Sequence, residues 1–435
     1  MKTCLHPKYL IPIEPRATVL TGHALVMQDE KILAILSSAD ARQHYPDALH
    51  LELSEHALMP GMINLHGHSA MSLLRGLADD LSLMDWLHNH IWPAEKQHVS
   101  EEFVFDGSVY AMAEMLRGGI TTINDMYFHH EAVARAGLHT GMRTVVGCSI
   151  LEFPTGYAAD ASAYLDKAMA AQQAFQGQVG VEFRLAPHAP YTVSDDTFKK
   201  IIALADKHDM GIHCHIHETM DEVNDSIRDH GMRPLQRLHQ LGVLSPRLIA
   251  AHMVHANEEE ISLLAQQGVH IAHNPASNLK LASGFAPVHA MQAAGVNVGI
   301  GTDGAASNNK LDLLGDLRMA ALLAKAVSSN PTALNAGNAL EMATLAGARA
   351  LGLDKQIGSL VAGKLADIIA IDLSALETLP LFDPVSQIVY AAGREQISHV
   401  WVNGRCLMAD RQLLNQDEAQ LKEKAVWWQQ RIAAA

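Results

Sequence analysis

Eight short apolar runs recur along the central part of this chain, and a longer stretch rich in Ala, Leu, Met and Glu follows each of them. The runs have the length of strands and the stretches that of helices. An alternation repeated eight times predicts eight parallel strands closed into a (β/α)8 barrel with its helices outside. The runs occupy residues 62–68, 120–126, 143–150, 181–190, 210–218, 248–256, 268–275 and 296–304, and helical sequence at 309–325 and 331–352 completes the last unit.

The competing architecture is a doubly wound open sheet, which also alternates strands and helices. Such a sheet binds its ligand at one switch point and commonly has a glycine-rich phosphate loop after its first strand. No loop of this kind follows the run at 62–68, and polar residues end many of the runs rather than one. The pattern therefore favours an α/β fold of the TIM-barrel type.

The chain is longer than one barrel requires. A barrel of this type needs about 250 residues, whereas the chain has 435. The surplus lies at both ends, where strand-like sequence recurs, and it predicts a small β-sandwich domain built from both termini and followed by an amphipathic helix. The strand-like segments are 17–36, 357–372 and 397–408, the last with a turn at Asn403-Gly404. The predicted boundaries are 1–59 and 356–435 for the terminal domain and 60–355 for the barrel.

The net charge and the distribution of apolar residues exclude some classes of binding partner. It has 32 Lys and Arg against 47 Asp and Glu, a formal net charge of −15, so its field repels nucleic acid and anionic lipid. No run of 18 apolar residues could span a bilayer, and the N-terminal sequence lacks the apolar core of a signal peptide. We expect a cytoplasmic protein that acts on a small molecule, with no nucleic-acid or membrane partner. A homo-oligomer is compatible with the sequence.

Histidine spacing at the end of the first run indicates a metal site. The four cysteines are too dispersed to form a metal knuckle or a redox pair, so metal chemistry must use imidazole and carboxylate groups. Residues two apart on a strand point to the same side, so His66 and His68 project together. They lie at the C-terminal mouth of the predicted barrel, where active sites of this fold are found.

The later runs offer further donors. His213, His215 and His217 share one parity on the fifth run, and strand geometry alone does not choose among them. A mononuclear hydrolytic metal takes about four nitrogen and oxygen donors and keeps one position for water. The remaining candidates at run ends are Glu218, His252, His255 and Asp303. We expect His273, on the seventh run, to hold the loop that follows rather than to touch the metal, and Asn274, Ser277 and Asn278 after it are typical turn formers.

Taken in order, these motifs resemble the amidohydrolase superfamily over nearly the whole chain. Within it they look most like the 5-methylthioadenosine/S-adenosylhomocysteine deaminases. The motifs are PGMINLHGHS, HIHET, AAHMVH, HNPASNLKLASG and GTDGAASNN, together with the stretch Trp92-Pro93-Ala94-Glu95.

The resemblance implies a ligand set. His66, His68, His215 and Asp303 would bind the metal, because only His215 stands three residues before Glu218-Thr219 as in the family pattern. His252 would face the attacking water. Glu95 would accept hydrogen bonds from ribose hydroxyls, His188 would reach the ribose side, and Trp86 would line the pocket.

The fourth run bears on the number of metal ions. Two-metal members of the superfamily bridge their ions with a carboxylated lysine on that strand, and residues 181–190 contain none, since Lys199 and Lys200 lie in the following helix. We therefore expect one ion and disfavour a hydantoinase or dihydroorotase. Zinc is expected, with iron as the alternative occupant.

The resemblance also implies a reaction, the hydrolytic deamination of an adenine nucleoside to its inosine analogue and ammonia. Glu218 would protonate ring N1, Asp303 would pass a water proton to the leaving amine, and His252 would orient the water. Family members that act on S-adenosylhomocysteine should offer a guanidinium to its carboxylate after the third strand. Residues 147–157 contain no Arg, although Arg143 is close, and Leu151, Phe153 and Tyr157 suggest an apolar seat. This favours 5′-methylthioadenosine and adenosine.

Two other functions remain open on the sequence. The runner-up is an aminohydrolase for another N-heterocycle, such as guanine or a triazine, for which a ribose-binding Glu95 would have no purpose. The second is a non-catalytic scaffold that keeps the fold, which the intact set of metal and acid-base residues argues against.

Overall fold

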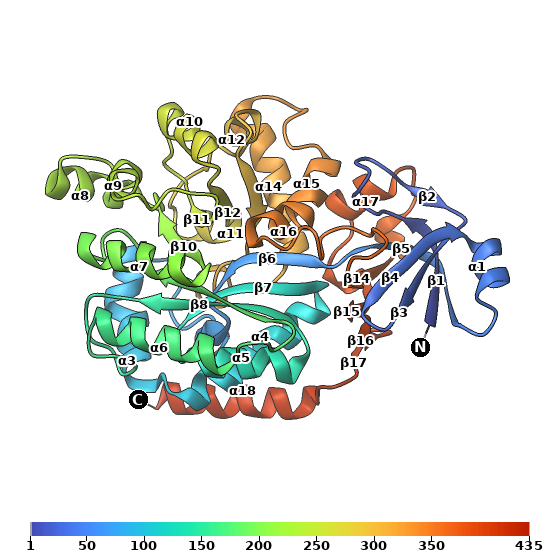
Figure 1. Ribbon diagram of the computed structural model, residues 1–435, viewed down its shortest axis with the longest axis horizontal. Coiled ribbons are helices and arrows are strands. Elements are labelled where there is room, and N and C mark those ends of the chain that lie inside the picture. Colours follow the sequence, from blue (N-terminus) through green and yellow to red (C-terminus); the bar gives the residue numbers. More distant parts are fainter. Residues whose placement is uncertain (1, 435) are drawn as a thin grey trace.

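The computed structural model describes residues 2–434, and its centre is an eight-stranded parallel barrel (Figure 1). Each strand pairs with the next one along the chain. Each also overlaps one of the eight predicted apolar runs, so the predicted barrel is confirmed. The strands are β6 (Met62–Gly67), β7 (Ile120–Tyr127), β8 (Arg143–Ile150), β9 (Val181–Pro187), β10 (Gly211–Ile216), β11 (Leu248–His252), β12 (His270–His273) and β13 (Asn297–Ile300).

Helices surround the barrel, and many begin where the sequence supplies a capping side chain. A polar side chain before the first turn accepts a backbone N–H that would otherwise lack a partner. Ser100, Asp160, Ser194, Thr219 and Asn257 do so. The helices after β6 to β12 are α4 (Glu101–Arg117), α5 (His130–Thr140), α6 (Ala161–Ala174), α7 (Asp195–His208), α8 (Met220–His230), α9 (Pro234–Leu241), α10 (Glu258–Gln267), α11 (Pro275–Lys280) and α12 (Val288–Ala293).

The last barrel unit differs in detail from the expected pair of helices. Helix α13 (Ala305–Asn308) follows β13, and α14 (Leu313–Ser328) begins at its capping residue Asp312. The helical stretch predicted over 331–352 contains two short helices, α15 (Ala336–Met342) and α16 (Leu345–Leu351). The two are separated because Thr344 has a non-helical backbone conformation (φ −133°, ψ −93°).

The strands near the two termini form one further sheet, in which β5 lies between β1 and β14. Blue and red strands therefore lie side by side in Figure 1. The sheet curls over a shared core that includes Leu25, Leu58 and Trp401, and a bridge from Lys31 to Leu365 joins its far edge to the C-terminal half. The strands are β1 (Lys2–Leu10), β2 (Leu20–Thr21), β3 (His23–Gln28), β4 (Lys31–Ser37), β5 (Leu49–Pro60), β14 (Ile368–Asp372), β15 (Ile397–Val402), β16 (Arg405–Ala409) and β17 (Gln412–Leu413).

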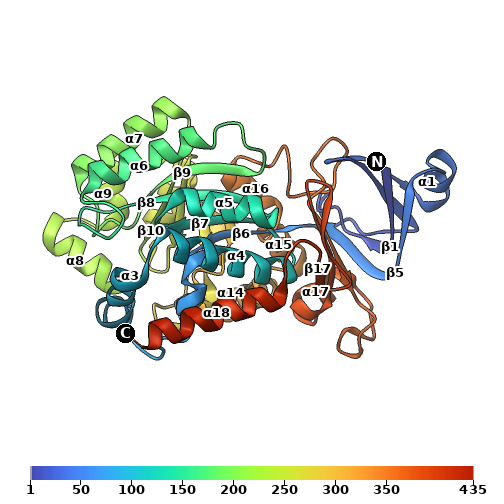
Figure 2. The same ribbon diagram turned by 90° about the horizontal axis from the view of Figure 1, so that it is seen from below.

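Two contacts fix this sheet and the C-terminal helix to the barrel. The guanidinium of Arg143, at the start of β8, donates to both carboxylate oxygens of Asp367 at 3.0 and 3.2 Å, and both side chains are buried. Helix α18 (Glu418–Ala433) crosses the outside of the barrel (Figure 2) and packs the buried Trp428 edge-on against Phe103. The terminal part also contains α1 (Ser38–His44) and α17 (Pro384–Tyr390). None of the helices in residues 2–434 is long and apolar enough to cross a bilayer.

The barrel closes between its last strand and its first. Asp303 N donates to His66 O at 3.0 Å, and Thr302 N donates to Asn64 Oδ1 at the same distance. Gly301 makes this approach possible: a Cβ at that position would lie 2.9 Å from both His66 N and His66 O, and 2.5 Å from Asn274 Oδ1. Closure therefore depends on a residue without a side chain.

We predict that Gly301→Ala destabilises the protein, because the added methyl group meets backbone atoms that cannot rotate away. The expected loss in free energy of unfolding is about 1–3 kcal/mol, the usual cost of overfilling a packed site. Thermal unfolding followed by circular dichroism measures it. Gly337→Ala in α15 is the control, since its Cβ would meet only Asn335 Oδ1 at 3.5 Å. A Gly301→Ala midpoint equal to that of the control would contradict the prediction.

Candidate metal centre and active site

A cavity of about 610 Å³ opens at the C-terminal ends of the barrel strands. This is the end at which loops of (β/α)8 barrels build active sites. Eight of the nine side chains singled out from the sequence line the cavity, and the ninth, His66, is fully buried beneath it. The lining members of the set are His68, Trp86, Glu95, His188, His215, Glu218, His252 and Asp303.

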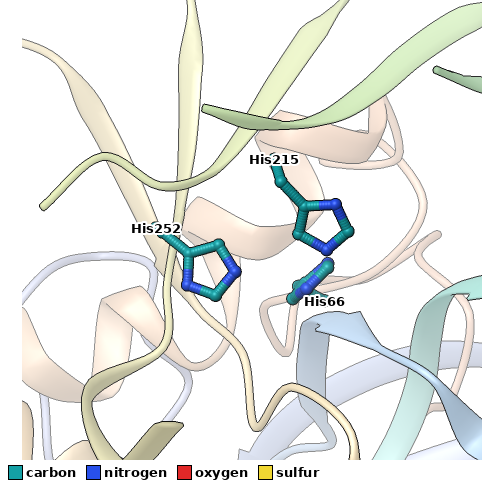
Figure 3. Close-up of side chains that lie close together, drawn as sticks. All are labelled: His66, His215 and His252. Carbon is teal, nitrogen blue, oxygen red and sulfur yellow. The ribbon is translucent and has the colours of Figure 1, made fainter. Parts of the chain in front are cut away.

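Imidazoles from three strands converge at the base of the cavity. His66 comes from β6, His215 from β10 and His252 from β11, and Figure 3 shows their rings turned toward one another. One ligand atom from each lies within 4.8 Å of the others, and the same holds for His66, His68 and Asp303. The Nε2 atoms of His68 and His215 are 3.3 Å apart. Such close nitrogen atoms suit a shared cation.

In the rings of His66, His68, His215 and His252, Nδ1 contacts a neighbouring group. Nε2 of each ring faces the other rings. A partner at one ring nitrogen fixes the orientation of a ligand histidine and determines which nitrogen is free. Here the partners are main-chain carbonyls and buried side chains. The Nδ1 contacts are His66 to His213 Nε2 (2.9 Å), His68 to Met126 O (2.7 Å), His215 to His188 O (2.7 Å) and His252 to Asn278 Oδ1 (2.8 Å).

The donor set fits a divalent metal ion. His66 Nε2 is buried without a hydrogen-bond partner, although Asp303 Oδ1 lies 3.1 Å away, and the same oxygen is 3.1 Å from His68 Nε2. An unsatisfied buried nitrogen is costly unless a ligand occupies it. Imidazole nitrogens with one carboxylate are the donors that zinc prefers when cysteine is absent. Burial would raise the pKa of Asp303, but the two imidazoles hold that pKa well below its usual range.

The geometry separates the three histidines of the fifth run, two in β10 and one directly after it, which strand parity could not. His215 lies in the cluster, whereas His213 lies behind it with its Nε2 on His66. His217 lies elsewhere: its Nε2 accepts the Leu235 N–H at 3.2 Å and is 3.1 Å from a Glu260 carboxylate oxygen. His255, the other candidate of the sixth run, contacts Ser283 O instead.

Glu218 occupies the cavity wall beside the cluster. Its carboxylate oxygen is 3.7 Å from His252 Nε2, and its side chain is 8% exposed. Burial raises the pKa of Glu218, while His252 acts in the opposite direction. The turn that presents it is held by Glu222, which accepts the backbone N–H groups of His217 and Glu218 at 2.9 and 2.8 Å. A buried carboxyl of raised pKa can act as a proton donor near neutral pH.

A second carboxyl group lies at the far side of the cavity. Glu95 belongs to α3 (Trp92–His98) and accepts a hydrogen bond from the buried Tyr127 hydroxyl at 2.7 Å. Burial raises the pKa of Glu95 to about 7, and the Tyr127 hydrogen bond only partly offsets this. Burial also lowers the pKa of His188 to about 3, so its ring is neutral, with Nδ1 3.1 Å from Thr192 Oγ1. Trp86, in α2 (Leu83–Trp86), is buried in the same wall.

The wall after β8 is apolar, as the sequence suggested. Leu151, Phe153 and Tyr157 all line the cavity, and the Phe153 ring lies 5.9 Å from that of Trp92 across the opening. No arginine is among the residues that line it. The nearness of Arg143 was misleading, because this side chain lies at the opposite end of β8 in its ion pair with Asp367.

Several contacts to the cluster were not expected from the sequence. Ser277 and Asn278 were assigned as turn formers, yet Ser277 Oγ donates to Asp303 Oδ2 at 2.6 Å and Asn278 orients His252. Ser307 also donates to Asp303 Oδ2, at 2.9 Å. Their only signal was their position directly after β12 and β13. His273 is the last residue of β12, where its carbonyl accepts the Gly301 N–H, and it is not part of the histidine cluster.

Comparison with known proteins identifies relatives along the whole chain. The model of the amidohydrolase family matches residues 57–407. A 5-methylthioadenosine/S-adenosylhomocysteine deaminase of Saccharophagus degradans is 44% identical over 98% of this chain and 96% of its own. A 5′-deoxyadenosine deaminase of Methanothermobacter thermautotrophicus is 42% identical over 85% of this chain and 86% of its own. The crystal structure of an adenosine deaminase from Xanthomonas campestris with bound zinc is 47% identical, has a TM-score of 0.98, and covers 100% of this chain and 99% of its own.

We predict that His215, and neither His213 nor His217, is the metal ligand of β10. His215→Gln should abolish binding of zinc, because an inward-facing nitrogen is lost. His217→Gln should still bind about one zinc ion per chain, and His213→Gln should bind about 10–100-fold more weakly, since only the support of His66 changes. Elemental analysis and competition with a chelator measure this. Zinc binding by His215→Gln together with its loss in His217→Gln would reverse the assignment.

Proposed function

Because the chain belongs to the amidohydrolase family, we propose that its cavity carries out the hydrolytic deamination of an adenine nucleoside, with the inosine analogue and ammonia as products. The observation that carries the proposal is the convergence of imidazole nitrogens from His66, His68, His215 and His252 with the Asp303 carboxylate, beside the buried Glu218 carboxyl, whose pKa burial raises. The three relatives described above, all named deaminases of adenine nucleosides, support the substrate class.

We further propose that His66, His68, His215 and Asp303 hold one zinc ion. When bound, zinc supplies a water molecule whose pKa falls from 15.7 to about 7. The zinc in the adenosine deaminase of Xanthomonas campestris supports this choice over iron. A single ion is supported by β9, which contains no lysine that could bridge two ions.

The proton transfers follow from the positions of three side chains. Glu218 donates its proton to ring N1 as the water oxygen attacks C6, which removes the aromaticity of the ring. Asp303 accepts one water proton and transfers it to the departing amine, which leaves as ammonia. The remaining proton of the attacking oxygen returns to Glu218 as the C6 carbonyl forms. His252, held at Nδ1 by Asn278, orients the water with its Nε2.

The far wall of the cavity suits a nucleoside rather than a free base. Glu95 would accept the ribose hydroxyls, with His188 on the same side and Trp86 against the ligand. Guanine and triazines carry no ribose hydroxyls for Glu95 to accept, so the proposal favours nucleosides over those substrates.

The apolar wall bears on the 5′ substituent. Leu151, Phe153 and Tyr157 would pack against a methylthio group, whereas this wall offers no guanidinium to the amino acid carboxylate of S-adenosylhomocysteine, and Lys96 is the cationic side chain in the lining. Burying an unpaired charge is costly. We propose 5′-methylthioadenosine and adenosine as better substrates than S-adenosylhomocysteine.

Three further predictions from the sequence stay proposals. They are the domain boundaries at 59/60 and 355/356, a cytoplasmic location, and self-association into a homo-oligomer.

A panel of purine nucleosides tests the activity. The adenine-to-hypoxanthine absorbance change should appear with adenosine and 5′-methylthioadenosine, and kcat/KM for the latter should exceed that for S-adenosylhomocysteine by about tenfold or more. Glu218→Gln should lower kcat by about 10²–10⁴, because the proton donor is lost, with zinc content unchanged.

Full turnover by Glu218→Gln at unchanged zinc content would overturn the acid-base assignment. A wild-type protein that binds zinc yet releases no ammonia from any purine would instead favour the scaffold. Higher kcat/KM for S-adenosylhomocysteine would refute the proposed substrate preference alone.

Glu95 should couple ribose binding to pH. A carboxyl with a pKa of about 7 is protonated at pH 6 and ionised at pH 8, so the KM for adenosine should fall as pH rises through 7. Hydrogen bonds to an ionised group contribute enough that Glu95→Gln should raise this KM about 10–100-fold and abolish its pH dependence. The KM for 2′,3′-dideoxyadenosine, which lacks both hydroxyls, should be unaffected. An equal rise for both nucleosides would show that Glu95 does not bind the ribose.

A further inference from the structure

The segment between β6 and α4 carries much of the proposed nucleoside wall. We call residues 75–98 the β6 loop. It holds α2 and α3, joined by a π-helical turn at Leu87–Ile91, and so presents Trp86 and Glu95 to the cavity. The loop must therefore keep a fixed position for these side chains to meet a ligand.

Part of this loop passes over a hollow. A second cavity of about 670 Å³ lies beside the first and is lined on one side by residues 80–84 and on the other by residues 219–221 and 280–283. Leu83 and Leu281 line both cavities. Residues 80–84 thus lack a densely packed layer on that side, whereas Leu83, Trp86, Leu87 and Ile91 pack into the hydrophobic core on the other.

One ammonium group ties the loop to the rest of the barrel mouth. Lys280, the last residue of α11, donates from Nζ to Asp79 Oδ1 at 2.5 Å, to Ala306 O at 3.3 Å and to Asn309 Oδ1. The Asn309 amide also donates to Asp79 Oδ2 at 3.3 Å. An ammonium has three N–H donors, and here each has an acceptor.

The three acceptors come from two parts of the barrel mouth. Asp79 belongs to the β6 loop. Ala306, in α13, and Asn309, its C-cap, belong to the segment after β13 that also carries Ser307, called here the β13 turn. Lys280 itself follows β12. Its side chain is 21% exposed and that of Asp79 is 38% exposed, so the pair is screened less than a fully exposed one.

We propose that Lys280 is a positioning residue that holds the β6 loop closed over the nucleoside side of the active-site cavity. Lys280 is not among the residues that line that cavity, so it acts through the loop and not on the ligand. The expected effect of Lys280 on catalysis rests on the proposed function. The closed position of the loop does not, because it is a property of the protein without ligand.

The proposal predicts an effect on binding and little on chemistry. If only a fraction of molecules has the loop closed, the apparent dissociation constant rises by the inverse of that fraction. A contact that is equally present in the bound ground state and the transition state changes KM and leaves kcat unchanged. Loss of the Lys280 contacts should therefore raise KM while the reacting groups at the base of the cavity keep their rate.

The test compares Lys280→Met with Lys199→Met in the zinc-loaded enzyme. Lys199 pairs only with Asp196 on the exposed face of α7, so its loss removes a surface ion pair and leaves the loop intact. Lys280→Met should raise the KM for adenosine about tenfold, the value expected if one molecule in ten stays closed, with kcat within about twofold of wild type. Lys199→Met should match wild type in both constants.

Hydrogen exchange without nucleoside provides the second measurement. Backbone amides of residues 76–98 should exchange faster in Lys280→Met than in wild type, while those of α7 stay unchanged. Asp79→Asn keeps the ammonium and removes its charged acceptor, so it should produce the same two effects even if Lys280→Met fails to fold. The double variant should be no worse than the stronger single one, because both remove one interaction.

Unchanged exchange over 76–98 in a folded variant would overturn the proposal. A fall in kcat as large as the rise in KM would also overturn it. Such a result would mean that the substitution acts on Asp303 through the β13 turn and not on the β6 loop. If wild type turns over no nucleoside, the proposed function fails, and faster exchange in both variants would still support the role of Lys280 in holding the loop.

Discussion

A buried imidazole needs a partner at each nitrogen, and this requirement organises the mouth of the barrel. Four rings satisfy Nδ1 with neighbours that belong to the scaffold: two main-chain carbonyls, His213 and Asn278. The Nε2 atoms are thereby directed to one region, where the Asp303 carboxylate contacts two of them. Hydrogen bonds behind the rings, rather than the rings themselves, determine where a metal ion would bind.

The sequence was sufficient for the barrel because its strands are buried on both faces and so appear as continuous apolar runs. The sequence was less informative about the strands near the two termini. The prediction did not include β1, which contains His6 and Pro7, or β5, although Leu49, Leu51 and Leu53 alternate as a half-buried strand requires. The histidines and carboxylates of the cluster were predictable as a set because they stand at or just after the ends of strands, whereas Trp86 and Glu95, in α2 and α3, came from the family resemblance. Ser277, Asn278 and Ser307 were not, since a polar residue after a strand serves a turn as well as a site.

Arg143 illustrates why nearness in sequence is a poor guide along a strand. An eight-residue strand spans roughly 25 Å, so the first and last residues of β8 lie at opposite ends of the barrel. Arg143 binds Asp367 at one end, and the apolar side chains of the following loop line the cavity at the other. The same separation explains how one strand can contribute both to the junction with the terminal sheet and to ligand selection.

The position of β5 has a consequence for synthesis. It pairs with β1 on one side and with β14 on the other, and the entire barrel lies between β5 and β14 in the chain. At translation rates of about 5–20 residues per second, β14 emerges roughly 15–60 s after β5. During that interval the nascent chain presents an unpaired strand edge, the feature that most favours aggregation. That edge stays unpaired until the ribosome has released β14, the strand that completes the pairing of β5.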